Sequence, residues 1–279
     1  MGNEVAVHLT VRLLGTPDAR IAGAPLVLHH QKARAILYYL AATGRPHTRD
    51  HLATLLWSES PDSNARHSLR SSLYHLRQAL HAKGAGEMLA GDGDQVYLKL
   101  DVDACDIAHF RRLLADGSES ALFEAISLYR GPLLQGFTLT DAPLFEEWVR
   151  FEEMDSRQAY AGALQRLATW AEQRQAWDEA ITYVQRIVQL DALSEEAQRR
   201  LIELYVHTGA IGQALRQYRQ FETELAQELS LTPSSETRAL LATILETRGG
   251  ATSPIKTMDL KSTTPRLRYA SLVASERSY

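Results

Sequence analysis

The 279-residue sequence has one cysteine, no long apolar run and only a small excess of negative charge. Cys105 on its own cannot form an intramolecular disulfide or a cysteine-only metal site, and such scarcity fits a reducing compartment. No apolar stretch approaches the roughly 20 residues that cross a bilayer, and Met1–Thr10 lacks the basic and apolar regions of a signal peptide. We therefore expect a cytoplasmic protein with no membrane partner.

Motifs for catalysis and cofactor binding are also missing. The sequence has no G-x-x-x-x-G-K-[ST] phosphate loop. His47 and His51 lie four residues apart, but no third metal ligand accompanies them, so we interpret them as surface histidines. We predict no enzyme activity, no metal and no cofactor.

Acidic residues cluster in two places without forming a recognisable site. The first cluster lacks the glycine and the final glutamate of a calcium loop, so we interpret its members as turn and cap residues: Asp92, Asp94, Asp101, Asp103 and Asp106. The second consists of paired glutamates beside Trp148 and Phe151, which we interpret as a solvated helix face: Glu146, Glu147, Glu152 and Glu153.

The net charge of −4 is unevenly distributed along the chain. Residues 1–115 carry 13 basic and 11 acidic residues, whereas residues 116–248 carry 12 and 21. Within the first part, residues 29–83 hold 8 basic and 3 acidic residues. This asymmetry is typical of phosphate contact at one end and protein contact at the other.

The first 105 residues predict a small sheet, three helices and a hairpin. Residues 5–14 alternate between apolar and polar and indicate a strand, and residues 26–28 suggest a second. Apolar spacing predicts a helix ending at Thr43-Gly44, and Thr48 is placed to cap a second helix over 49–57. A third helix is predicted over 62–80, followed by a hairpin around Gly91-Asp92-Gly93-Asp94. This order predicts a winged helix-turn-helix.

The third predicted helix has a leucine stripe at positions 69, 73, 76 and 80 and a polar face opposite it. In a winged helix this element enters the major groove, where arginine can bridge guanine and asparagine can pair with adenine. The predicted DNA-binding residues on or near this helix are Asn64, Arg66, His67, Arg70, Ser71, Tyr74, His75, Arg77, Lys83 and Arg49. Lys32 and Arg45 are further candidates for phosphate contact.

From Asp106 to about Thr247 helical patterns continue almost unbroken. Placing Ala180 on Ala214 also superimposes Leu167 on Leu201 and Val184 on Tyr218, an offset of 34 residues that is typical of tetratricopeptide repeats. The predicted fold is therefore mainly α, with an N-terminal winged helix-turn-helix followed by an all-α tetratricopeptide-like domain. The predicted boundaries are 1–105 and 106–248, with 249–279 as a linker or tail.

Several segments of the second half resemble the bacterial transcriptional activator domain found in Streptomyces antibiotic regulatory proteins. The resemblance rests on Tyr129-Arg130-Gly131-Pro132-Leu133-Leu134, on Glu147-Trp148 and on later markers such as Asp191, Gly209 and Pro233. Gln173-Arg174-Gln175 and Ser230 depart from it, because relatives commonly have glycine at these turns. The resemblance implies a regulator whose helical domain contacts RNA polymerase and a second copy, as a homodimer or a tandem pair on direct repeats.

We therefore predict a sequence-specific transcriptional regulator that binds double-stranded DNA. Two alternatives stay open. The chain could be a protein-interaction adaptor, in which case the third helix should expose an apolar docking patch. It could also be the DNA-binding end of a larger ATP-dependent sensor. The operator, the regulated genes and the choice between activation and repression have no signature in the sequence.

Overall fold

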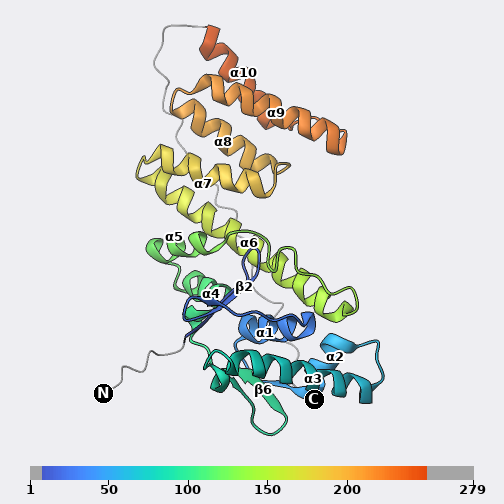
Figure 1. Cartoon of the computed structure of the whole chain (residues 1–279). Helices are drawn as coiled ribbons and strands as arrows, with labels where there is room; N and C mark the ends of the chain where they lie inside the picture. Colours follow the sequence, from blue (N-terminus) through green and yellow to red (C-terminus); the bar gives the residue numbers. More distant parts are fainter. Residues whose placement is uncertain (1–7, 250–279) are drawn as a thin grey trace, which may run out of the picture.

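The computed structural model describes residues 8–249 (Figure 1). The first part of the predicted strand at 5–14 and nearly all of the predicted tail at 249–279 lie outside these residues. The described chain has a lower part, the winged head (residues 8–98), and an upper part, the helical array (residues 106–249). No helix in the described part has the length and hydropathy needed to span a membrane.

The winged head begins with an antiparallel sheet of β1 (Leu9–Arg12), β2 (Asp18–Ile21) and β3 (Ala24–Pro25). Alternation in β1 buries Leu9 and Val11, as the pattern predicted. The strand predicted at 26–28 is wrong: β3 covers Ala24–Pro25, and the chain leaves the sheet after a last hydrogen bond from Leu26 N to Ala19 O at 2.8 Å. Strand β2 was missed, although Ala22 and Gly23, both at positive φ, form the tight turn that pairs it with β3.

Three helices follow at the predicted places. Helix α1 (Gln31–Thr43) ends at Gly44 in the left-handed conformation, and α2 (Arg49–Trp57) begins where the Thr48 hydroxyl accepts a hydrogen bond from His51 N at 3.1 Å. Helix α3 (Asp62–His81) buries its whole leucine stripe, each leucine being at most 2% exposed. Burial of four leucines on one face determines which side of α3 is left for solvent.

The predicted hairpin is present as the wing. It consists of the short 3-10 helix η1 (Gly86–Met88), β5 (Leu89–Ala90) and β6 (Gln95–Leu98). Strand β6 also pairs with the two-residue strand β4 (His47–Thr48), which the sequence analysis missed. This pairing holds the wing against the start of α2.

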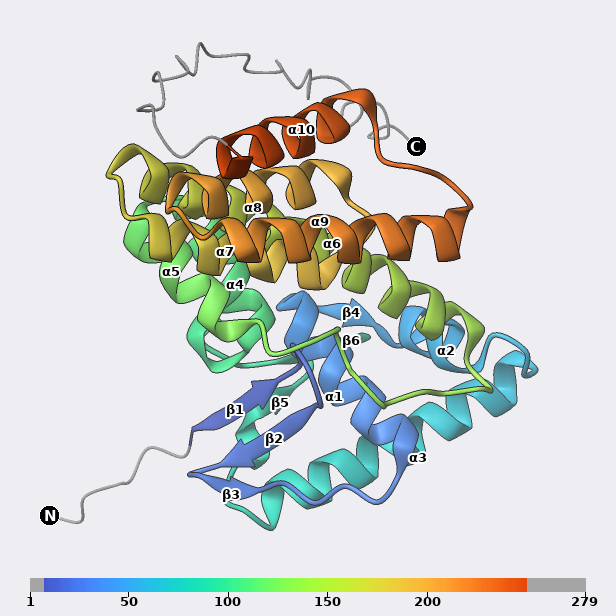
Figure 2. The same cartoon turned by 90° about the horizontal axis from the view of Figure 1, so that it is seen from above.

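The helical array follows the 3-10 helix η2 (Val102–Ala104) and runs from α4 (Asp106–Asp116) and α5 (Glu119–Leu128) to the long α6 (Pro143–Gln173). It continues with α7 (Trp177–Leu190), α8 (Glu195–His207), α9 (Ile211–Leu229) and α10 (Ser235–Gly249). Successive helices stack side by side in Figure 1, and Figure 2 looks along this stack, so that α6 to α9 overlap there. Leu167 and Leu201, related by the 34-residue offset, are both buried, as are Ala180 and Ala214.

The two turns that depart from the resembling family keep the glycine-type geometry. Gln175 has φ +59° and Ser230 has φ +56°, in the left-handed region that favours glycine. The equivalent of Gln175 one repeat later is Gly209, at φ +74°. The turns at Gln175 and Ser230 are therefore formed at a cost in backbone strain, because neither residue is a glycine.

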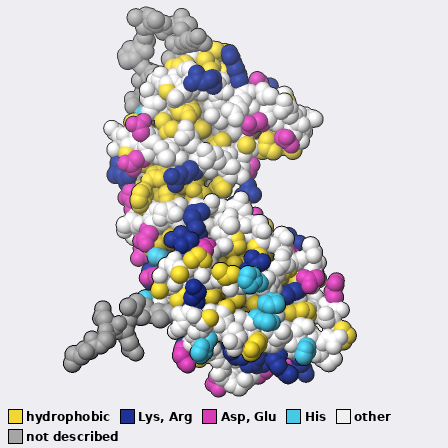
Figure 3. All heavy atoms as spheres, viewed as in Figure 1, with side chains coloured by type: hydrophobic (Ala, Val, Ile, Leu, Met, Phe, Trp, Pro, Cys, Tyr) yellow, Lys and Arg dark blue, Asp and Glu magenta, His cyan; other side chains and the backbone are white. Residues whose placement is uncertain are grey.

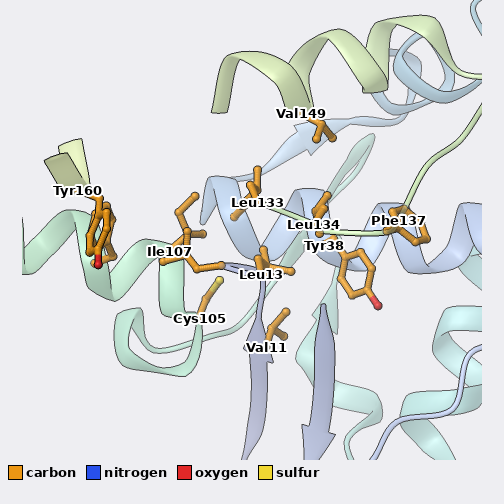
Figure 4. Packing of buried hydrophobic residues seen from close by; sticks show 14 of the residues in the cluster. Val11, Leu13, Tyr38, Cys105, Ile107, Leu133, Leu134, Phe137, Val149 and Tyr160 are labelled. Atoms are coloured by element: carbon orange, nitrogen blue, oxygen red, sulfur yellow. The ribbon is translucent and has the colours of Figure 1, made fainter. Parts of the chain in front are cut away.

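Buried residues of the winged head and the helical array form one contiguous cluster. Leu13 and Tyr38 from the head lie close to Leu133, Leu134 and Phe137 from the segment before α6 (Figure 4). The predicted domain boundary falls next to Cys105, which is 1% exposed within this cluster. The two parts therefore pack as one body in the described chain.

Candidate nucleic-acid interface

The candidate interface is the polar face of α3. Seven of the predicted residues on this helix are exposed: Asn64, Arg66, His67, Arg70, Ser71, Tyr74 and Arg77. In Figure 3, Lys and Arg side chains lie along the lower edge of the molecule, which α3 and the wing form in Figure 1, and histidines gather over the same half. Helix α3 lies at the opposite end of the molecule from α8–α10 in both cartoon views. Within the described residues, this face of α3 is therefore exposed to solvent.

Arg66 is held by a carboxylate of the neighbouring helix. Its Nε and Nη2 donate to the two carboxylate oxygens of Asp50 on α2, at 2.8 and 3.2 Å. This hydrogen bonding is the main cause that raises the pKa of Arg66, and the negative charge of Asp50 adds to it. The sequence analysis missed Asp50, which lies 16 residues away on another helix. Arg66 must exchange this partner if it is to bind a phosphate or a base.

His75 is the one predicted residue of α3 that is half-buried. Its imidazole stacks on that of His30, just before α1, with ring centroids 3.7 Å apart. The Tyr74 ring packs edge-on against the His75 ring, with centroids 5.7 Å apart, and the Tyr74 side chain is otherwise exposed. His30 thus contacts one residue of the candidate interface, His75, and nothing in its local sequence indicated this role.

Arg49 and Lys83 lie at the two ends of the interface. The backbone N–H of Arg49 donates to Asp94 O in the wing at 2.9 Å, and its side chain is half-buried. Lys83 is exposed just beyond the end of α3. The wing tip beside Arg49 carries the exposed Asp92 and Asp94, whose charges repel phosphates, so phosphate contact is better suited to the flanks of the wing than to its tip.

Lys32 is not available for phosphate contact, and this prediction is wrong. Its ammonium donates to Leu56 O at 2.6 Å and to Asp141 O at 3.2 Å, pairs with the Asp141 carboxylate at 3.0 Å, and lies over the Trp57 ring. Only 14% of its side chain is exposed. The partner is 109 residues away, so no local pattern could reveal it. Arg45, the other candidate, is exposed.

Of the histidine pair considered as metal ligands, His51 is exposed, as predicted, whereas His47 is only 7% exposed, so the surface interpretation is wrong for His47 alone. The two rings stack at 5.1 Å, and their Nε2 atoms are engaged by Thr43 Oγ1 at 2.9 Å and by Tyr39 OH at 2.8 Å. Burial lowers the pKa of His47 to about 4, and the neighbouring His51 and Arg45 add to this effect. The pKa of His51 is lowered mainly by burial and then by Arg45. Within residues 8–249, no three potential metal-ligating side chains gather around one point.

Some of the acidic residues assigned to solvated or local roles make long-range contacts. Glu146 Oε1 accepts a hydrogen bond from Leu139 N at 2.6 Å, and Glu152 pairs with Arg111 of α4. Asp106, assigned to a turn or cap, is buried and accepts hydrogen bonds from the winged head. The solvated-face interpretation is therefore wrong for Glu146 and Glu152, because both side chains bind partners beyond their own helical turn.

The chain is similar to known proteins over most of its length. The family model described as the bacterial transcriptional activator domain matches residues 105–245. The transcriptional regulatory protein EmbR of Mycobacterium tuberculosis is 30% identical over 261 residues, which cover 86% of this chain and 64% of EmbR. MoaR1 of Mycobacterium bovis, also named a transcriptional regulatory protein, is 25% identical over 251 residues, 84% of this chain and 78% of MoaR1.

A solved structure of Mycobacterium tuberculosis EmbR in complex with a low-affinity phosphopeptide matches this chain with a TM-score of 0.59 and 26% identity. The match covers 90% of this chain and 67% of that one. It confirms the predicted fold class, a winged helix followed by a helical domain. The chain spans 64% of the length of the curated EmbR sequence, so EmbR includes a portion without a counterpart here.

Proposed function

The chain belongs to the bacterial transcriptional activator domain family, and on this premise we propose that it is a transcriptional regulator that binds double-stranded DNA with α3 in the major groove. Both curated relatives are named transcriptional regulatory proteins. The proposed role involves no catalysis and no cofactor, and it places the protein in the cytoplasm with the chromosome.

One observation carries the proposal. Helix α3 buries its leucines completely and leaves a continuous polar face uncovered at the end of the molecule farthest from α10. Arg70 and Arg77 are exposed on one flank of this face at a spacing of two turns, which places two guanidinium groups along one groove. Exposed arginines in this position suit guanine recognition, and the neighbouring Asn64 suits adenine.

The remaining predicted residues take supporting roles in the proposal. Lys83, Arg49 and the hydroxyl of Ser71 are placed to bind phosphates at the edges of the groove. Arg66 joins them once it leaves Asp50. Such contacts make the affinity depend on salt, because each neutralised phosphate releases counterions.

The helical array is proposed to contact a second copy and RNA polymerase, so that a homodimer or tandem pair binds direct repeats. Its acidic balance, 21 acidic against 12 basic residues over 116–248, disfavours DNA contact there and suits a protein partner. Because the chain spans only part of EmbR, these partners belong to the proposal alone. The alternative that the chain is the DNA-binding end of a larger ATP-dependent sensor depends on sequence that is not part of this chain.

The adaptor alternative is less well supported. A protein-docking surface on α3 should present an apolar patch, yet Tyr74 is the only large hydrophobic side chain exposed on this helix, all of which is described. Its neighbours on the open face are polar or basic. This composition favours a nucleic-acid ligand.

The test is selection of binding sites from random duplex DNA, followed by gel shifts at several salt concentrations. We expect one enriched sequence, and we expect Arg70→Ala and Arg77→Ala each to weaken binding to it by about 1–3 kcal/mol. Arg219→Ala, an exposed arginine of α9 with the same change in charge, is the matched control and should bind like the wild type. No enrichment, or equal loss in all three variants, would defeat the proposal.

A further inference from the structure

The joint between the winged head and the helical array depends on a buried carboxylate. Asp106, the first residue of α4, is 7% exposed, and its oxygens accept hydrogen bonds from the backbone N–H groups of Leu13 and Leu14 at 2.7 and 3.1 Å. The guanidinium of Arg130 completes the set at 2.8 Å. One side chain of the array is thus bonded both to the end of the first strand of the head and to the segment before α6.

Backbone hydrogen bonds also connect the first strand of the head with the segment before α6. Leu134 N donates to Leu13 O at 2.8 Å, Gly15 N donates to Pro132 O at 3.0 Å, and Gln135 N donates to Gly15 O at 3.0 Å. Gly15 has φ +107°, and a Cβ there would come within 3.3 Å of Arg130 Cβ. Figure 4 shows Leu13 beside Leu133 and Leu134 at this point. The segment that carries the family resemblance, 129–134, therefore forms the joint.

Further contacts hold the head from other sides. Lys32 of α1 binds Asp141, and Arg111 Nη1 of α4 donates to Ala42 O at 3.1 Å. The ring of Tyr39 packs edge-on against Trp148 of α6 at 4.8 Å. Contacts in several directions oppose rotation of the head about any single axis.

From these contacts we propose that Asp106 and Arg130 are positioning residues that fix the reading helix α3 relative to the array, and so set the spacing between two binding sites. The inference rests on the proposed function. When two molecules associate through their arrays, a rigid joint places the two α3 helices at one separation, and only half-sites with the matching distance and helical phase can bind both. A loosened joint lets each head reach other spacings.

Arg130 is the better residue to replace. Its side chain is 40% exposed, and without it the Asp106 carboxylate keeps both backbone donors, so the fold should survive. Asp106→Asn is the second variant: it keeps the shape, removes the charge that Arg130 binds and replaces one of the two oxygens that accept from Leu13 N and Leu14 N by an NH2 donor. Arg130→Lys keeps the charge and should restore the wild-type behaviour in part. Arg112→Ala, an exposed arginine of α4 paired with Asp103, is the matched control.

The experiment uses the full chain and duplexes carrying the selected sequence once, or twice as a direct repeat with the spacer lengthened one base pair at a time over a full helical turn. For the wild type and Arg112→Ala we expect a preferred spacer, with affinity at least about tenfold lower half a turn away. For Arg130→Ala and Asp106→Asn we expect single-site affinity within about twofold of the wild type and a spacer preference at least about twofold weaker than that of the wild type, since the contacts of Lys32 and Arg111 still restrain the head in part.

The outcomes separate the two proposals. A wild-type protein that binds no single site contradicts the proposed function itself. A wild type that binds single sites but shows no preferred spacer, or an Arg130→Ala variant with the wild-type profile, overturns the positioning role while leaving the proposed function intact. Thermal unfolding of each variant above the assay temperature checks that the profile is measured on folded protein.

Discussion

Acidification should destabilise this protein before its carboxylates titrate, because of His47. The side chain is 7% exposed, packed between Thr43 and the His51 ring, and burial is the main cause that lowers its pKa to about 4. An imidazole in the unfolded chain has a pKa of about 6.5. Between these two values the unfolded chain binds a proton that the folded protein excludes.

The sign and size of this change in the free energy of unfolding follow from proton linkage. Because the folded-state pKa is depressed, the stability contributed by the neutral His47 is complete above pH 6.5 and is lost as the pH falls toward 4. Lowering the pH from 7 to 5 should therefore reduce the free energy of unfolding by about 2 kcal/mol through this side chain alone. The lowered pKa of His51 acts in the same direction.

The assay is urea unfolding of the wild type and of His47→Gln at pH 7, 6 and 5. Glutamine keeps a polar group near Thr43 but does not titrate, so the variant should start less stable and lose about 2 kcal/mol less on going to pH 5. His81→Gln, at the exposed end of α3, is the control and should follow the wild type. Parallel losses in the wild type and His47→Gln would refute the reasoning.

Three further outcomes are expected from single substitutions. Gln175→Gly should raise the free energy of unfolding by about 0.5 kcal/mol, because relief of left-handed strain exceeds the entropy that glycine adds to the unfolded chain, whereas Gly209→Ala at the equivalent turn should lower it in the same urea assay. Asp50→Asn should strengthen DNA binding by about 2- to 10-fold in gel shifts at low salt, since it frees Arg66 and removes a negative charge near the phosphates; unchanged affinity would show that Arg66 plays no part. Leu76→Ala should cost about 2–5 kcal/mol in thermal or urea unfolding, because that leucine is fully buried on α3.

Patterns over short stretches were enough to predict most of the winged head. The third helix and its buried face followed from leucines at steps of three and four, and the start of α2 from the Thr48 cap. These features depend on residues within one or two turns of each other, so their signal is complete in the local sequence. The two-residue strand β4 left no such signal, because it exists only by pairing with β6, 49 positions away at His47↔Val96 and 47 at Thr48↔Gln95.

The DNA-binding residues themselves remain predictions, while their surroundings were decided by packing between distant segments. Arg66 and Lys32 were indistinguishable as basic residues in a basic stretch, yet one lies exposed beside Asp50 and the other is enclosed by Asp141 and Trp57. In the same way, nothing near Asp106 indicates that it binds the backbone at Leu13 and Leu14. Helix periodicity assigns a residue to a face, but only the folded chain brings together groups separated by about a hundred residues and so decides which charges stay free for a ligand.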